Sequence, residues 1–196
     1  WLGVTFGLVF RVGTMYWVID AMTRFGGLPL PAALAGAAAL FGYLAIFPGL
    51  FMLALRRLDP AAATTPLLAG AVWTGLELLQ TRLFTGFPWL LIGYAGGRSA
   101  LMIPRADVAG GYGLGFLVVA ADGALAGLAL RRRIPWRPAV AVALLLALAA
   151  GYGALRLREH PPAETAPPEP DWLAVGLAQG NVAQDEKWDS SRLDEV

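Results

Sequence analysis

"AALAGAAALFGYLAIFPGLFMLAL", residues 32–55, contains no charged side chain and is followed directly by Arg56 and Arg57. About 20 apolar residues in a helix are enough to cross the hydrocarbon core of a bilayer. The 196-residue chain is 57% apolar and 15% charged, whereas soluble domains are about 25% charged. We therefore predict a mainly α, polytopic helical membrane bundle over residues 1–157, with about five spans at residues 2–22, 32–55, 62–83, 108–130 and 138–157.

Arginine in the loops orients these spans. Arg56 and Arg57 separate the second span from the third, and four more arginines separate the fourth from the fifth: Arg131, Arg132, Arg133 and Arg137. Short loops rich in arginine stay in the cytoplasm. We therefore expect both loops on the cytoplasmic side, and the loop around "TGFPW" (residues 85–89) and everything after residue 157 on the outside.

The texture of the sequence changes after the last predicted span. Residues 158–170, "REHPPAETAPPEP", are rich in proline and acid, which is typical of a stiff extended linker. Beyond it, Leu173, Val175 and Leu177 alternate with other residues as in a strand, and "QGN" (179–181) follows as a turn. We predict that an α/β domain begins at about residue 171, with only its first strand and turn inside this chain.

Composition excludes several kinds of site. The chain has no cysteine and a single histidine, His160, so it offers no disulfide, no thiol nucleophile and no multi-histidine metal site. Its net charge of +1 argues against nucleic acid as a partner. No metal or cofactor is predicted. Both ends fall inside patterned sequence, and we interpret the chain as a fragment of a longer one.

Two acids lie inside predicted spans, Glu77 and Asp122. An ionisable group at membrane depth is a functional candidate because burying its charge is costly. The alternative is that each acid bonds to a neighbouring helix or lies near the membrane interface. Arg11, in the first span, receives no role from the sequence.

The run "LFTGFPWLLIGYA", residues 83–95, follows the span that contains Glu77. Gly86 and Pro88 prevent a helix from continuing, which places Phe87 and Trp89 in an irregular loop. Such backbone is tolerated at membrane depth only against protein or a wet cavity. The aromatic residues here, Tyr94 included, therefore form either an interfacial belt or the wall of a pocket in the outer leaflet.

Four stretches together resemble the apolipoprotein N-acyltransferase family. They cover nearly the whole chain in order: "YWVIDAMTRFGGLPLP" (16–31), "YLAIFPGLF" (43–51), "LFTGFPWLLIGYA" (83–95) with Glu77 eight residues before Thr85, and "AQGNVAQDEKWD" (178–189). The resemblance implies an enzyme of the bacterial inner membrane with eight spans. It also implies a periplasmic, nitrilase-like domain of the carbon-nitrogen hydrolase type (α-β-β-α) before the last span, of which this chain would hold only the start.

The activity implied by the resemblance is acyl transfer in two steps. A cysteine of the enzyme takes an acyl chain from a phospholipid as a thioester, and the amino group of the S-diacylglyceryl cysteine of an apolipoprotein accepts it. A glutamate acts as the base and a lysine holds the oxyanion. These three residues would lie beyond Val196, so Glu77 and Lys187 are not among them and this chain alone is expected to be inactive.

The resemblance also carries over individual positions. Trp188 matches a tryptophan near the mouth of the family's active site, Trp89 matches one near the lipid entrance, and Glu77 matches a glutamate without a specified role. Gln80, Arg105 and Asp122 depart from the residues usual there, which weakens the case for a polar network at the entrance. Our hypothesis is that the loop lines an acyl-chain portal, for which the candidates are Phe87, Trp89, Tyr94 and Glu77.

Two other functional classes stay open on the sequence. A transporter would suit kinked spans and buried acids, although the chain shows no inverted repeat and predicts a strand-forming domain. A membrane scaffold without chemistry is the other alternative. The partners expected under the acyltransferase hypothesis are a phospholipid donor, a diacylglyceryl apolipoprotein acceptor and the lipid bilayer.

Overall fold

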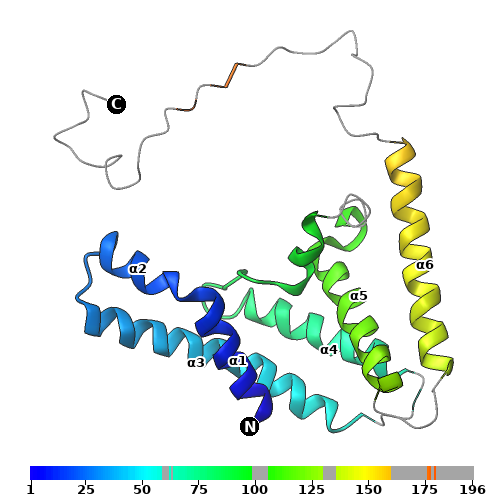
Figure 1. The fold of residues 1–196 in the computed structure, drawn as a ribbon, viewed down its shortest axis with the longest axis horizontal. Helices are drawn as coiled ribbons and strands as arrows, with labels where there is room; N and C mark the ends of the chain where they lie inside the picture. The colour runs from blue at the N-terminus through cyan, green and yellow to red at the C-terminus, as the bar shows by residue number, and fades with distance from the viewer. Residues whose placement is uncertain are drawn as a thin grey trace.

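The computed structural model describes residues 1–58, 62, 64–98, 106–129, 136–159, 176–177 and 179. All regular structure in these residues is helical (Figure 1): α1 (Leu2–Met15), α2 (Trp17–Arg24), α3 (Leu30–Leu55), α4 (Thr65–Gln80), the 3₁₀ helix η1 (Ile92–Arg98), α5 (Ala106–Ala129) and α6 (Trp136–Glu159). The predicted helical bundle is confirmed. The start of the α/β domain, apart from residues 176, 177 and 179, lies outside the described residues.

Three of the described helices are long and apolar enough to cross a membrane. They are α3 over Leu30–Leu55, α5 over Asp107–Gly127 and α6 over Ala139–Glu159, and α1 with α2, bent by 53° at their junction, together form a fourth candidate. Helix α4 has 16 residues. At 1.5 Å per residue it rises about 24 Å, less than the roughly 30 Å of the hydrocarbon core. The third expected span, residues 62–83, therefore stays a prediction.

Successive long helices alternate in direction (Figure 1). The N-terminus, the C-terminal ends of α3 and α5 and the N-terminal ends of α4 and α6 gather at one end of the bundle. Arg56 and Arg57 follow α3, and Arg137 lies in the first turn of α6. We call this the arginine end. The helix ends that flank both arginine-rich loops thus lie at one end of the molecule; the side of a membrane that this end faces stays a prediction.

Glycines permit close approach of the two best-packed helix pairs, α1 on α3 and α4 on α5. A Cβ on Gly7 would lie 2.9 Å from the Cα of Ala45 in α3, and a Cβ on Gly70 would lie 2.8 Å from the carbonyl oxygen of Phe116 in α5. Small residues let helix backbones meet in this way in membranes. The packing thus depends on positions where a side chain does not fit.

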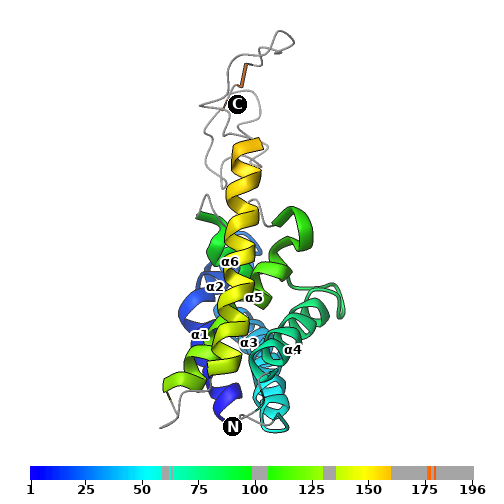
Figure 2. The ribbon, with the colours of Figure 1, turned by 90° about the vertical axis from the view of Figure 1, so that its right-hand side faces the viewer.

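Helix α6 lies on the outside of the bundle, against α5 (Figure 2). Near its C-terminal end, the Tyr152 hydroxyl donates to the Asp107 carboxylate at 2.8 Å, and Arg156 Nε donates to the same carboxylate at 3.0 Å. These contacts connect the end of α6 to the start of α5, at the end of the molecule opposite the arginine end.

Candidate functional site

The chain leaves helical geometry at Gln80 and enters an irregular loop, residues 81–91, before η1. Gly86 has a positive φ of 76°, and a Cβ there would overlap the carbonyl oxygen of Thr81. Phe84 and Leu90 also have positive φ, 56° and 59°, which is uncommon for residues other than glycine. The loop is therefore held in a conformation that its surroundings must stabilise.

Three buried polar side chains hold this loop: Arg11 of α1, and Glu77 and Gln80 of α4. They are 6%, 6% and 3% exposed. Arg11 Nη2 donates to Gln80 Oε1 at 3.4 Å. We call these three residues the buried polar cluster. It connects α1 to the helix from which the loop departs.

The buried polar cluster binds the backbone of the loop at two places. Gln80 Nε2 donates to the Phe87 carbonyl at 3.0 Å, and the Phe87 N–H donates to the Gln80 carbonyl at 3.1 Å. The Ile92 N–H donates to Glu77 Oε1 at 2.8 Å. A hydrogen bond removed from water is worth more than an exposed one and is costly to leave unmade. The positions of both Phe87 and Ile92 are fixed by these bonds.

The aromatic residues of the loop divide between two sides. Trp89 is 54% exposed and packs on Trp17 of α2, with ring centroids 5.4 Å apart. Phe87 is half-buried and packs against a core cluster formed by α1, α2 and α3. Tyr94, 57% exposed, lies in η1 beside Gly111 of α5. Phe87 and Trp89 thus pack against elements of the N-terminal half, α1–α3, whereas Tyr94 lies beside α5.

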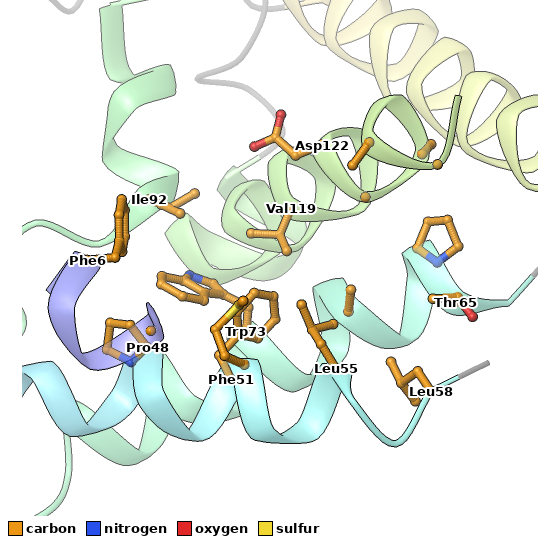
Figure 3. Close-up of a pocket in the computed structure, with 18 of the residues that line it drawn as sticks. Phe6, Pro48, Phe51, Leu55, Leu58, Thr65, Trp73, Ile92, Val119 and Asp122 are labelled. Atoms are coloured by element: carbon orange, nitrogen blue, oxygen red, sulfur yellow. The ribbon is translucent and has the colours of Figure 1, made fainter. Parts of the chain in front are cut away.

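An apolar cavity of about 760 Å³ lies between α1, α3, α4 and α5. Figure 3 shows the rings of Phe51 and Trp73 at its centre, with Val119 across from them and the Asp122 carboxylate pointing away from the Trp73 ring. The cavity extends to Leu55, Leu58 and Thr65 near the arginine end. Its walls suit hydrocarbon, and of the polar candidates only the exposed Asp122 lines it.

A second, smaller cavity of about 110 Å³ adjoins the first. The two share the walls made by Phe6, Pro48, Trp73 and Ile92. The smaller one is also lined by all three members of the buried polar cluster. The large apolar cavity is therefore adjacent to the buried polar cluster.

The site residues predicted from the sequence lie in different places in the structure. Glu77 lies in the buried polar cluster and Phe87 and Trp89 in the loop beside it, whereas Trp188 and Arg105 lie outside the described residues. None of Phe87, Trp89 and Tyr94 lines either cavity. Whether any of these residues meets substrate stays a prediction.

Sequence reasoning assigned no role to Arg11. The sequence does carry one related signal, because Gly3, Gly7 and Arg11 recur every fourth position and small residues mark a face where helices approach closely; in the structure these three residues and Met15 are the buried residues of α1. Residues four apart lie on one face of a helix, so this spacing places the guanidinium on the face that packs inward.

Comparison with known proteins gives a consistent result. A family model described as the apolipoprotein N-acyltransferase N-terminal domain matches residues 1–124. The apolipoprotein N-acyltransferase of Geobacter metallireducens is 35% identical over 202 residues, covering 100% of this chain and 37% of that protein. Those of Bordetella bronchiseptica and Chromobacterium violaceum are 39% and 34% identical, each covering 99% of this chain and 36% of the relative. The chain thus spans little more than a third of the length of these relatives.

Proposed function

The chain belongs to the apolipoprotein N-acyltransferase family, and on that premise we propose that it is the membrane portion of an enzyme that acylates lipoproteins. The acyl chain would come from a phospholipid and pass through an enzyme thioester to the amino group of a diacylglyceryl cysteine. Because this chain contains no cysteine, it cannot form a cysteine thioester by itself. The nucleophile, base and lysine would belong to the nitrilase-like domain that we place from about residue 171 onward.

We further propose the bacterial inner membrane as the location, with residues 158–196 in the periplasm. The arginine-rich loops support this orientation, because such loops stay in the cytoplasm. In this arrangement Trp188 would lie near the mouth of the catalytic domain. The acyltransferase proposal is preferred to the transporter and scaffold hypotheses because the matching relatives are named as acyltransferases.

The proposed role of the loop 81–91 is to present aromatic side chains to the phospholipid. One observation carries it: Trp89 stays 54% exposed although the loop backbone beside it is tied to buried groups at Phe87. Tryptophan favours the headgroup level of a bilayer. A ring held there on a fixed backbone can orient a lipid without itself entering the protein core.

A chimera tests the proposed function. Residues 1–196 replace the aligned segment of the Geobacter metallireducens relative, and acyl transfer from phospholipid to a diacylglyceryl lipopeptide is followed by mass. We expect the chimera to be active. A chimera that inserts into the membrane but transfers no acyl chain would contradict the proposal.

Within that chimera, Trp89→Ala tests the loop. We expect thioester formation to slow about tenfold, which corresponds to ~1.4 kcal/mol, because the substitution removes the lipid-facing ring and its contact with Trp17. Trp136→Ala is the matched control, since Trp136 is 63% exposed but lies at the arginine end. If the two variants insert normally and form the thioester at equal rates, the loop has no role in acyl transfer.

A further inference from the structure

Six buried side-chain atoms of the described residues have no hydrogen-bond partner, and four of them belong to three residues that surround one cavity. These four are Arg11 Nε, Arg11 Nη1, Trp73 Nε1 and Glu77 Oε2. Arg11 and Glu77 are each only 6% exposed. No ion pair joins Arg11 to Glu77, although both belong to the described part of the chain. Arg11 and Glu77 thus each make one hydrogen bond and keep further buried atoms without a partner, as does the indole N–H of Trp73.

These atoms belong to residues that line one space, the smaller cavity of about 110 Å³. Leaving a buried charge uncompensated is strongly unfavourable. A water molecule occupies about 30 Å³ in the liquid and needs two to four polar partners, so the cavity has room for about three waters. The free atoms, with Gln80 beside them, supply enough donors and acceptors to bind that number.

The charges around the cavity determine which ligand fits. An anion would be attracted by Arg11 but repelled by Glu77, and a cation the reverse. A neutral ligand that both donates and accepts hydrogen bonds satisfies both groups at once. We propose that Arg11, Trp73 and Glu77 enclose an ordered water site that compensates the two buried charges across the cavity.

The water site has a consequence for the loop. Glu77 accepts the Ile92 N–H, and Arg11 donates to the same Gln80 side chain that binds Phe87. Bridging waters would therefore keep Arg11 and Glu77 in the orientations that fix both ends of the loop. This inference rests on the structure of the bundle and does not depend on the proposed acyl transfer.

A double-mutant cycle on the full chain in lipid nanodiscs tests the compensation. Arg11→Met and Glu77→Gln each leave one buried charge without its counter-charge, and we expect each to lower the unfolding temperature by about 5–10 °C. The double variant removes both charges, and we expect it to regain most of that loss. Should a single variant fail to fold, folding of the double variant is the same supporting result.

The exposed pair Asp20–Arg24 provides the control for the cycle. Its atoms are 2.8 Å apart but lie at the surface, so Asp20→Asn and Arg24→Met should have small, nearly additive effects. Additive losses for Arg11 and Glu77, or a double variant that does not fold, would overturn the proposed compensation.

The water itself is detected by magnetisation transfer from water to the Trp73 indole proton in ¹⁵N-Trp-labelled chain, with Trp73→Phe identifying the resonance. We expect clear transfer in the unsubstituted chain and its loss in Leu76→Phe, because Leu76 lines the cavity and the larger ring fills it. Leu78→Phe, on the exposed face of α4, should leave the transfer unchanged. Absence of transfer in the unsubstituted chain would overturn the water site.

Discussion

Gly86 determines the course of the loop after α4. Its φ of 76° is one that side-chain-bearing residues rarely adopt, and a Cβ there would overlap the Thr81 carbonyl oxygen. The Gly86 N–H donates to the Leu83 carbonyl at 3.0 Å, which closes the turn. One residue later, Phe87 meets Gln80. Both the conformation and the close approach therefore require glycine.

We predict that Gly86→Ala destabilises the chain by about 2 kcal/mol, the cost of a strained backbone position plus a steric overlap. Gly75→Ala is the matched control, because Gly75 lies in α4 with no atom within 4 Å of the added Cβ. That change should stabilise by up to about 1 kcal/mol, since alanine favours helix over glycine. Thermal unfolding in nanodiscs measures both, and equal effects of the same sign would refute the argument.

At the residue scale, the sequence was informative where the signal is local. Gly86 and Pro88 predicted an irregular loop, and an acid inside an apolar span marked Glu77 as a candidate. The partnership of Arg11 with Gln80 was not predictable, because 69 residues separate them and only the fold, with α1 packed on α3 and α3 on α4, brings them together. The free space between Arg11 and Glu77 is likewise a property of packing.

At the scale of elements, the contact of α1 with α3 depends on two glycines in the first half of α1. Gly3 and Gly7 lie against Pro48 and Ala45, where added Cβ atoms would collide with backbone atoms of α3. Close backbone approach increases the van der Waals contact that holds helices together in a bilayer. The same packing brings Arg11, one turn after Gly7, into the interior.

We predict that Gly7→Leu separates α1 from α3 and costs about 2–3 kcal/mol through overpacking. Gly13→Leu, on the same helix, should be nearly neutral because nothing lies within 4 Å of its Cβ. Thermal unfolding measures both variants. A Gly7→Leu chain as stable as Gly13→Leu would contradict the described packing.

Helix extents followed from the sequence to different degrees. Expected spans 32–55, 108–130 and 138–157 correspond to α3, α5 and α6, which are long and apolar. The stretch 62–83 yields only the 16-residue α4, because Gln80 bonds to Phe87 instead of continuing the helix into the apolar residues that follow. The bend between α1 and α2 carried no signal, since no proline or glycine stands at Tyr16.

At the scale of the whole molecule, the alternating direction of the helices separates Arg56, Arg57 and Arg137 from the C-terminal end of α6. Arg56, Arg57 and Arg137 gather at one end, while α6 runs to Glu159 at the other and leads toward the residues that we assign to the catalytic domain. Under the proposed acyl transfer, that second end would face outward, toward the lipoprotein acceptor. The proposed function therefore requires that the two ends of the bundle lie on opposite sides of the membrane.

Because the chain contains no cysteine, sidedness can be measured with single-cysteine variants and a membrane-impermeant maleimide. The central measurement compares Ser191→Cys, in the segment assigned to the outer domain, with Arg57→Cys at the arginine end, in cells with a permeabilised outer membrane. We predict that Ser191→Cys is labelled while the inner membrane is intact, and that Arg57→Cys is labelled only after lysis. Labelling of Arg57→Cys across an intact inner membrane, with Ser191→Cys protected until lysis, would contradict the proposed orientation.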